Sequence, residues 1–440
     1  MQQKTALSAP AVIALVYVTC IALGALGLKT LTVEGITISW SDAFFTATSA
    51  VTVTGLTVFD IGSTLRFEGE LLLVLLMQLG GLGLMTLGVV VLSTIGIKVD
   101  LVQRVYLRTE LGTSGLSGIL RLARKILTIV IVFELLGALA LGFIFVPQLG
   151  VSDGVWAAVF HSVSAFNNAG FSLFADSMVS QALASTSVLL VLSSLFVVGG
   201  LGFIVLSDVI ARRHWSAYSF HTKLTLAGAA TLLVLGPLFV GLLEWNNSET
   251  LGGIANPASR LVFAWFEGVT PRTAGFNAIP TAQMTDANAL VTLGLMVVGG
   301  GSTSTAGGLK VTTAVVLVLS TVAFFRRSEH VHCFDHSIST LAMLKVMALV
   351  TISFGFLFVA TFLLLVTHDL ALLDAAFEVT SAFATVGLSR GATGELNEFG
   401  RIVIGVVMFF GRLGPLTLGL LLTHKASDRL TYPEGEVLLG

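Results

Sequence analysis

Residues 374–390 read DAAFEVTSAFATVGLSR, in which an aromatic residue and a run rich in Ser and Thr precede a glycine and a leucine. Three other stretches have the same form, with Leu or Phe after the glycine: 41–59 (SDAFFTATSAVTVTGLTVF), 156–174 (WAAVFHSVSAFNNAGFSLF) and 261–279 (LVFAWFEGVTPRTAGFNAI). Their glycines, Gly55, Gly170, Gly275 and Gly387, lie 115, 105 and 112 residues apart. Self-similarity at a fixed period marks a repeat architecture, so four units of about 110 residues are expected to fill the chain.

Charged residues make up 11% of the chain and apolar residues 55%. Soluble proteins carry about 25% charged residues, so this chain lacks the polar atoms that a water-exposed surface needs. The composition therefore predicts a membrane protein. Its two cysteines, Cys20 and Cys333, form neither a disulfide framework nor a CxxC pair. The first apolar run, 9–28, has no cleavage site followed by a soluble domain, so we interpret it as a retained span and not as a signal peptide.

Two long apolar runs flank the glycine-containing stretch of each unit. The first runs are 9–28, 126–145, 224–243 and 341–366, and the second runs are 71–97, 188–210, 290–325 and 402–423. Only about 10 to 12 residues before each glycine can form a helix, too few to cross a hydrocarbon core about 30 Å thick. These stretches should therefore enter the membrane and return as re-entrant hairpins.

The expected fold is an all-α polytopic membrane protein. Four covalently linked repeats of span, re-entrant pore hairpin and span would surround one pore, in a pseudo-fourfold arrangement like that of a potassium channel. The units are residues 1–97, 98–210, 211–325 (with the broken second span) and 326–440 (with the C-terminal tail).

Basic residues gather on one side of this map: 15 of the 23 fall in the N-terminus, the loops between units and the C-terminus. By the positive-inside rule that side is cytoplasmic, so both termini are expected in the cytoplasm and all four hairpins enter from outside. Of the 25 acidic residues, 16 map to the outer side. Acids near a pore mouth concentrate cations, although most of these acids individually also fit solvated loops.

The hairpins can supply ligands for a monovalent cation. Backbone carbonyl groups replace the water of a dehydrated ion in selectivity filters, and irregular backbone at membrane depth is tolerated where it lines a cavity. Glycine permits positive φ, so an extended strand can aim carbonyl groups at a common axis. Of the four strands, one has the Thr-Val-Gly order of a potassium-channel filter. The candidate filter residues, with potassium at their carbonyl oxygens, are Val53, Thr54, Gly55, Asn168, Ala169, Gly170, Thr273, Ala274, Gly275, Thr385, Val386 and Gly387.

A second glycine-rich signature follows each of these glycines within 30 residues: 80–83 (GGLG), 199–202 (GGLG), 299–302 (GGGS) and 411–414 (GRLG). Close packing of helices through small residues explains it as well as a functional role does. In the third unit it continues as GGGSTSTAGG over residues 299–308. Each glycine costs a helix about 1 kcal/mol relative to alanine, so this span should unwind just below the filter. A kink without a gating role is the alternative.

Two basic residues lie near this break. A charge at membrane depth costs about 2.5 to 3.5 kcal/mol, so Arg412 should face the cavity or pair with a carboxylate. Below the filter it would oppose the exit of cations, and pairing with Glu134 is the alternative. Lys310 is expected at the lower edge of the break, pointing toward the cytoplasm. The candidate gate residues are Gly299, Gly300, Gly301, Ser302, Thr303, Ser304, Thr305, Ala306, Gly307, Gly308, Lys310 and Arg412.

Metal and nucleotide motifs are absent from the sequence. We expect His161 to be a hydrogen-bonded residue of the second hairpin. His330, His332 and His336 near Cys333 lack the paired spacing of a zinc site, which favours a polar cytoplasmic loop. Residues 299–308 are followed by Leu309 and Lys310 and not by Lys-Ser, so they are not a nucleotide P-loop.

Taken together, the four units, the single glycine in each hairpin, the break at 299–308 and Arg412 resemble the Trk/Ktr/HKT superfamily of potassium transporters over nearly all of the chain. Within it the chain most resembles the pore subunits of Ktr systems (KtrB). Gly55 matches the potassium-selective members, whereas HKT members with serine at that position differ. The third hairpin is one residue shorter before its glycine, which leaves the register of Pro271 and Arg272 open.

The resemblance implies potassium uptake across the bacterial inner membrane, with sodium as an activator or co-ion. It implies that the loop 299–308 obstructs the pore and moves during transport. It also implies a homodimer with one pore per chain and a cytoplasmic nucleotide-binding ring of a separate KtrA-type subunit. The sequence has no dinucleotide fingerprint of its own, so the basic loop 98–125 and the tail from Lys425 are the expected docking surfaces.

Two other classes of function are alternatives to ion transport. A secondary transporter of a small polar solute would also use broken helices at the membrane midplane, but a hairpin in every unit disfavours it. An intramembrane enzyme would need a catalytic motif, and the sequence contains no HExxH, no pair of carboxylates inside a span and no Ser-His-Asp arrangement. The chain is therefore expected not to be an enzyme.

Overall fold

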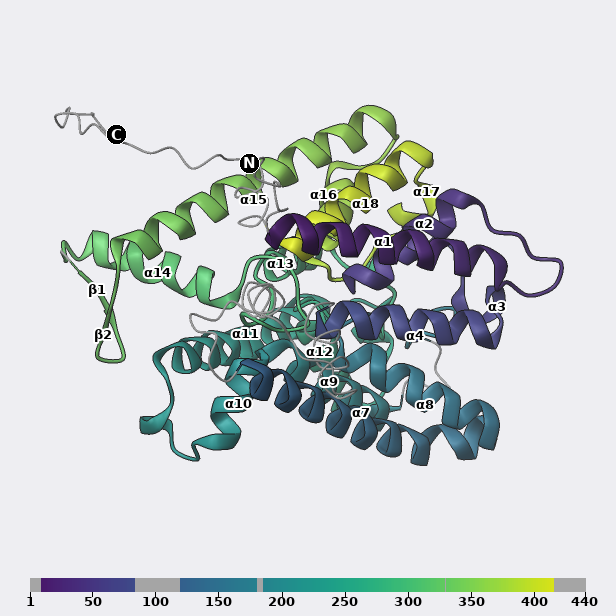
Figure 1. The fold of residues 1–440 in the computed structure, drawn as a ribbon, viewed down its shortest axis with the longest axis horizontal. Coiled ribbons are helices and arrows are strands. Elements are labelled where there is room, and N and C mark those ends of the chain that lie inside the picture. Colours follow the sequence, from purple (N-terminus) through teal and green to yellow (C-terminus); the bar gives the residue numbers. More distant parts are fainter. Residues whose placement is uncertain (1–8, 84–118, 180–184, 329, 415–440) are drawn as a thin grey trace, which may run out of the picture.

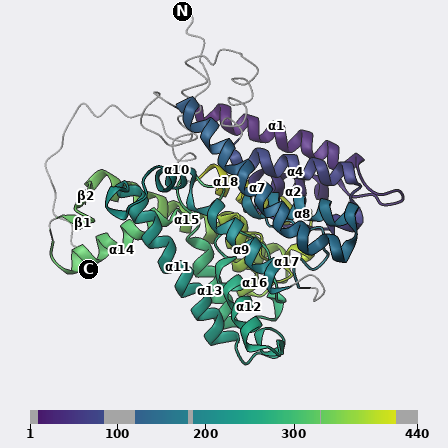
Figure 2. The ribbon, with the colours of Figure 1, turned by 90° about the horizontal axis from the view of Figure 1, so that it is seen from below.

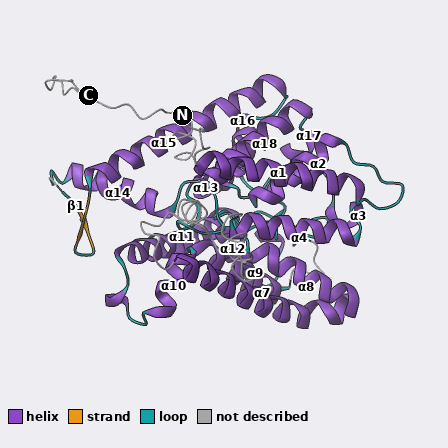
Figure 3. Ribbon diagram, in the orientation of Figure 1, coloured by secondary structure: helices purple, strands orange, loops and turns teal. Residues whose placement is uncertain are grey.

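The computed structural model describes residues 9–83, 119–179, 185–328 and 330–414. Within these ranges nearly all regular structure is helical, and one two-stranded sheet completes it (Figure 3). The all-α architecture expected from the sequence is confirmed. The predicted span residues 84–97 and 415–423, most of the basic loop 98–125 and the tail from Lys425 lie outside the described residues.

The first apolar run of every unit forms one long helix (Figure 1). Each of these helices is long and apolar enough to cross a membrane. Ser219 and Ser339 cap two of them, with side chains that accept from the backbone N–H three residues later. The four helices are α1 (Ala9–Thr30), α7 (Ile119–Leu149), α11 (Phe220–Glu244) and α15 (Thr340–Thr367).

A short helix precedes each of the four glycines, as the hairpin interpretation predicts. We call these the hairpin helices. At 1.5 Å per residue, their 13 to 16 residues are too short to cross a core about 30 Å thick. A capping box of Ser39 and Asp42 starts the first, and Asn256 with Pro257 starts the third. The hairpin helices are α2 (Trp40–Thr52), α8 (Val151–Phe166), α12 (Pro257–Val269) and α16 (Leu372–Ala384).

The second apolar runs are shorter or broken. In the second unit the expected continuous span is instead bent by 95° at Gly202. Gly202 has φ +101°, and the carbonyl group of Ser302 occupies the place of the Cβ that it lacks, so contact with another unit holds the bend. The helices are α4 (Phe67–Leu82), α9 (Thr186–Leu201) with α10 (Phe203–Ala211), α13 (Asp286–Val297) with α14 (Val311–Phe325), and α18 (Glu398–Leu413).

Helices α4 and α18 have 16 residues each, about 24 Å at 1.5 Å per residue, so their described parts do not cross the core alone. The eight full crossings therefore stay a prediction.

Figure 2 shows the β1–β2 hairpin beside α14 and far from α8. The remaining elements are α3 (Ile61–Thr64), α17 (Ala392–Glu395), the 3-10 helices Trp215–Ala217, Leu251–Gly253 and Thr281–Gln283, and strands β1 (Val331–Cys333) and β2 (His336–Ile338).

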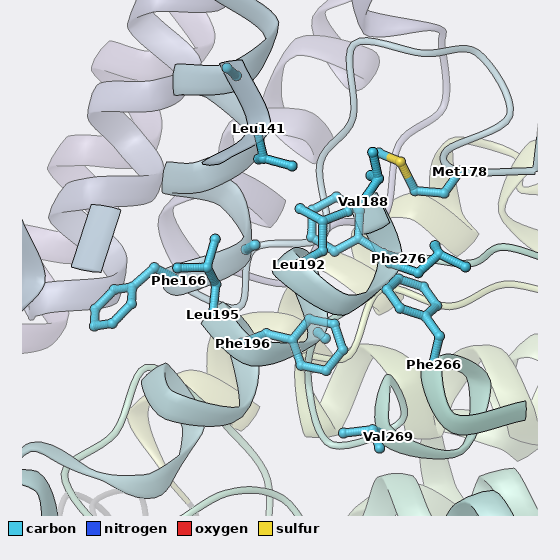
Figure 4. Close-up of a cluster of buried hydrophobic side chains, with 14 of the residues drawn as sticks. Leu141, Phe166, Met178, Val188, Leu192, Leu195, Phe196, Phe266, Val269 and Phe276 are labelled. Carbon is cyan, nitrogen blue, oxygen red and sulfur yellow. The ribbon is translucent and has the colours of Figure 1, made fainter. Parts of the chain in front are cut away.

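The units pack in a cycle. The second helix of each unit lies against the hairpin helix of the next: α4 on α8, α9 on α12, α13 on α16, and α18 back on α2. Figure 4 shows one of these interfaces, where Leu192 and Phe196 of α9 meet Phe266 of α12 in a buried apolar cluster. Burial of such side chains stabilises each joint by about 1.5 to 3 kcal/mol per large residue. The cyclic packing directs the carboxyl ends of all four hairpin helices toward one place.

Candidate functional site

Each hairpin helix ends in a segment that begins and ends with positive φ. We call residues 53–55, 168–170, 273–275 and 385–387 the glycine segments. Their first residues, Val53, Asn168, Thr273 and Thr385, have φ of 57°, 57°, 72° and 52°. The glycines two residues later, Gly55, Gly170, Gly275 and Gly387, have φ of 95°, 69°, 77° and 94°.

The four glycines form a closed ring in chain order. A Cβ on Gly170 would lie 2.9 Å from the Cα of Gly275, and one on Gly387 would lie 3.2 Å from the Cα atoms of both Gly275 and Gly55. Each would also meet the carbonyl oxygen of the residue before the next glycine. These carbonyls belong to Ala169 for Gly55, Ala274 for Gly170, Val386 for Gly275 and Thr54 for Gly387.

The ring therefore has no room for a Cβ at any of its four glycines, and each glycine faces a backbone oxygen of its neighbour. The sequence predicted that these residues would converge around one conduit, and the structure brings all four together. Carbonyl groups gathered in this way can coordinate a dehydrated alkali cation.

Hydroxyl side chains at the end of the hairpin helices hold the glycine segments. The Ser49 hydroxyl accepts from the N–H of Gly55 at 3.0 Å, and the Ser381 hydroxyl accepts from that of Gly387 at 3.1 Å. In the third unit the Thr270 hydroxyl donates to Phe276 O at 2.6 Å, as Ser164 does to Phe171 O at 2.7 Å in the second.

The register left open by the sequence follows from these bonds. Ala274 N donates to Thr270 O, four residues back, whereas Thr54 N donates to Ser49 O, five residues back. Thr270 therefore takes the place of the three serines, and the missing residue lies between it and the glycine. Arg272 turns away from the ring and donates to Ala229 O at 3.3 Å.

A cavity of about 730 Å³ opens above the ring and is lined by all four glycines. Asp60 and Asp176 also line it. The acidic side chains expected at the outer mouth are thus represented in this cavity, where they attract cations.

The glycine-rich loop 299–308 lies against the opposite side of the glycine segments. The Thr305 hydroxyl donates to Asn168 Oδ1 at 2.9 Å, and the amide of Asn168 donates to the Thr273 hydroxyl at 3.3 Å. A Cβ on Gly307 would collide with the side chain of Thr385. The loop therefore contacts two of the four glycine segments directly, at Asn168 and Thr385, and reaches a third, at Thr273, through the side chain of Asn168.

Backbone bonds hold the loop in place. Gly299 N donates to Leu309 O at 2.8 Å and closes the base of the loop. Gly301 N donates to Gly200 O at 2.8 Å, and Phe203 N donates to Thr303 O at 3.0 Å. Because these partners lie on either side of the bend at Gly202, the loop of the third unit and the bend of the second form one joint.

Arg412 joins this loop to the first unit. Its guanidinium donates to Thr305 O and to Gly80 O, with a longer contact of 3.4 Å to Gly81 O. The alternative pairing with Glu134 is not formed: Glu134 accepts from Gln78 at 3.2 Å and from Asn167 at 2.9 Å. Within the described residues, the hydrogen-bond partners of the Arg412 guanidinium are backbone carbonyl groups and not a carboxylate.

Lys310 and Arg412 line a cavity of about 210 Å³ on this side of the ring. The sequence predicts that Lys310 points toward the cytoplasm. Its ammonium instead bends back over the loop and donates to Ala306 O at 2.5 Å. Both cations of the candidate gate therefore gather around the glycine-rich loop.

The second glycine signature has two separate roles. Gly80, Gly199 and Gly411 have no room for a Cβ, because each faces the last carbonyls of a hairpin helix at Val51, Phe166 and Phe383. These contacts are the close packing through small residues that the sequence analysis gives as one of two explanations for the signature. The last glycines of the signature, Gly83, Gly202 and Gly414, have φ of 84°, 101° and 84° and end the helices before them.

Several buried polar residues near the ring were not singled out from the sequence. Glu267 and Glu378 belong to the 16 acidic residues that the sequence maps to the outer side, yet they are buried on α12 and α16. Each directly follows a phenylalanine of a hairpin helix, Phe266 or Phe377, and a carboxylate in such an apolar context is the signal that would have identified them. His161 is hydrogen-bonded within the second hairpin, as expected. Among the described residues no group of three His, Cys, Asp or Glu side chains could hold a metal ion.

Comparison with known proteins agrees with this architecture. The sequence profile of the TrkH family, described as a cation transport protein, matches residues 2–431. The Ktr system potassium uptake protein B of Bacillus subtilis is 40% identical, over 92% of this chain and 90% of that protein. The potassium/sodium uptake protein NtpJ of Enterococcus hirae is 36% identical, over 91% of this chain and 89% of that protein.

Among solved structures, the crystal structure of the potassium transporter TrkH from Vibrio parahaemolyticus superimposes with a TM-score of 0.75. The match covers 96% of this chain and 87% of that chain at 22% sequence identity, so it supports the fold. With the profile match over nearly the whole sequence, these likenesses show that the chain belongs to the TrkH family of cation transport proteins.

Proposed function

We propose that this protein carries potassium ions into the cell across the bacterial inner membrane, through the ring formed by Gly55, Gly170, Gly275 and Gly387. The observation that carries the proposal is the closed ring itself, in which each glycine faces a backbone carbonyl of the next segment. The names of the two relatives as potassium uptake and potassium/sodium uptake proteins agree with it.

In this proposal the twelve residues of the glycine segments are the selectivity filter. Their carbonyl oxygens replace the hydration shell of potassium, and the carboxyl ends of the four hairpin helices add a negative helix dipole toward the ion. The acid-lined cavity supplies cations from outside. The membrane potential drives them inward with about 2.3 kcal/mol per charge per 100 mV.

The gate is the loop 299–308 with Lys310 and Arg412. The loop lies directly against the filter side chains Asn168 and Thr385, so an ion that leaves the filter meets it first. Two positive charges beside it oppose the passage of a cation. Conduction then requires the loop to move away from the filter and Arg412 to give up its carbonyl partners.

The finer organisation follows the sequence predictions. The four units are residues 1–97, 98–210, 211–325 and 326–440, with both termini in the cytoplasm. The chain forms a homodimer with one pore per chain, and a KtrA-type nucleotide-binding ring binds its cytoplasmic face. Sodium activates or accompanies transport, which agrees with the name of the Enterococcus relative.

A secondary transporter of a polar solute is the second candidate, because the bend between α9 and α10 and the break between α13 and α14 resemble the discontinuous helices of such proteins. A solute site would draw on those two breaks alone. The participation of all four units in the ring favours the ion pathway.

The test is the substitution Gly387→Ala, measured by potassium-dependent growth of an uptake-deficient bacterium and by rubidium flux into liposomes. The new methyl group would displace Thr54 O from the ring, so potassium uptake should fall and sodium should enter more easily. Gly35→Ala is the matched control, because Gly35 has φ +85° and no atom within 4 Å of its Cβ position. Equal uptake by both variants would refute the filter.

A further inference from the structure

One position of the hairpin helices carries a buried polar side chain in all four units. Counted back from the filter glycine it lies nine residues away in units one, two and four, at Thr46, His161 and Glu378. In the third unit, whose segment is one residue shorter, it lies eight residues away, at Glu267. All four side chains are at most 1% exposed.

In the fourth unit this side chain is a hydrogen-bond acceptor for the chain that follows the filter. Glu378 Oε2 accepts from the Ser389 hydroxyl at 2.7 Å, and its other oxygen accepts from the Thr393 hydroxyl. Ser389 is only two residues beyond Gly387. The bond therefore fastens the outer end of the filter segment to its own hairpin helix.

The third unit does the same with backbone donors. Glu267 Oε1 accepts from the N–H of Ala278 at 2.5 Å and from that of Ile279 at 3.1 Å. Its other oxygen is buried without a hydrogen-bond partner among the described residues. Since the donors begin three residues after Gly275, the anchored stretch is again the one that follows the filter.

In the second unit a histidine takes the place of the carboxylate. His161 Nε2 lies 3.0 Å from the Ser172 hydroxyl and 3.4 Å from Leu173 N, and Nδ1 lies 2.7 Å from Ala157 O. The tautomer with its proton on Nδ1 satisfies all three contacts, because Nε2 then accepts from both donors. Ser172 is two residues beyond Gly170, as Ser389 is beyond Gly387.

The first unit lacks this anchor. The Thr46 hydroxyl is buried and has no hydrogen-bond partner among the described residues. Three units therefore hold the outer end of their filter segment with a buried acceptor, and the first does not. The difference provides an internal control at an equivalent position of the same fold.

We propose that Glu378, Glu267 and His161 are positioning residues of the cation site, which act as buried acceptors that hold the outer end of three filter segments. The inference rests on the proposed function, since it concerns the same ring. Discrimination between ions of different radius depends on carbonyl groups held to about 0.5 Å, and unfastened segments would let them relax. Each position supplies a hydrogen-bond acceptor at the required place, and either a carboxylate or an imidazole can serve.

The experiment measures competition between rubidium and sodium in liposome flux. Glu378→Met removes both acceptors and should lower the preference for rubidium roughly tenfold, the loss expected for a buried hydrogen-bond pair. Glu378→Gln keeps an acceptor oxygen and an amide that the two hydroxyls can bind, so its preference should stay within about twofold of the wild type. Thr46→Val removes an unpartnered hydroxyl and should change nothing.

A double variant guards against misfolding of Glu378→Met. Ser389→Ala with Thr393→Val removes the donors and leaves Glu378 in place, so it should lower the preference as Glu378→Met does. Combining all three changes should cost no more than either set alone, because both sets remove the same two hydrogen bonds. Additive losses would overturn the inference.

Three further results would also contradict it: full selectivity in Glu378→Met, equal damage in Glu378→Gln and Glu378→Met, or an equal loss in Thr46→Val. Failure of the proposed function would look different. Wild-type protein that carries no potassium or rubidium would refute the uptake function, whereas selective flux that survives Glu378→Met would refute only the positioning role.

Discussion

Replacing Arg412 by glutamine should open the pathway. In the wild type two guanidinium N–H groups donate to Thr305 O and Gly80 O, which ties the glycine-rich loop to the first unit. A hydrogen bond from a charged group contributes about 1.5 to 3 kcal/mol, so losing both would cost the closed arrangement at most about 3 to 6 kcal/mol. Glutamine and water would restore half or more of this lost free energy. If the closed state is then about 2 kcal/mol less stable than in the wild type, the gate equilibrium shifts roughly 30-fold toward the open state.

The assay is rubidium flux into liposomes that contain equal amounts of folded protein. Arg412→Gln should raise the initial flux several-fold and up to roughly 30-fold, within the shift estimated above. Arg401→Gln is the matched control: it removes an arginine of the same helix, α18, whose partner is Asp42 and not the loop. Unchanged or reduced flux in Arg412→Gln, with a normally folded protein, would refute the gate assignment.

Two further changes test the joints around the ring. Thr305→Val removes the hydrogen bond to Asn168. The closed state then loses about 1 kcal/mol, so rubidium flux should rise roughly fivefold. Flux equal to the wild type would show that this contact does not hold the loop. Gly80→Ala places a methyl group against Val51 O, so overpacking of about 1 to 3 kcal/mol should lower the melting temperature and potassium uptake together. Gly405→Ala, where no atom lies within 4 Å of the Cβ position, should change neither, and equal melting temperatures for the two variants would contradict the close-packing account.

The sequence predicted the repeat and the ring because both leave strong local signals. The long run 341–366 identifies α15 to within one residue at each end, whereas α7 begins seven residues before the run 126–145. The four glycines were found by their shared context of aromatic, hydroxyl and small residues. Convergence of the glycines followed from repetition alone, since four equivalent hairpins can meet around one axis.

The bend at Gly202 was not predicted, for a physical reason. A glycine in an apolar run permits either close helix packing or positive φ, and the choice depends on what packs against it. Here the partner is the loop of the third unit, at Ser302 and Thr303, which is distant in sequence. Gly199 shows the other outcome three residues earlier, where it stays helical and packs on Phe166 O.

The burial of the acidic residues on the hairpin helices was not predicted from the sequence either. Glu267 and Glu378 are acidic residues on the outer side of the map, where most acids face water. Their burial follows from the cyclic packing of α9 on α12 and of α13 on α16, which encloses both helices. Arg412 contacts the loop through backbone carbonyl groups, which carry no side-chain signal in a sequence, so its partners could not be predicted.

The most direct test of the account is the position of a bound heavy alkali ion. Crystals of the protein grown in rubidium should show an anomalous peak on the axis of the ring, within coordination distance of the carbonyl oxygens of Thr54, Ala169, Ala274 and Val386. Gly387→Ala should abolish or displace that peak. A rubidium site away from the ring, together with an empty ring axis in protein that transports potassium, would contradict the account.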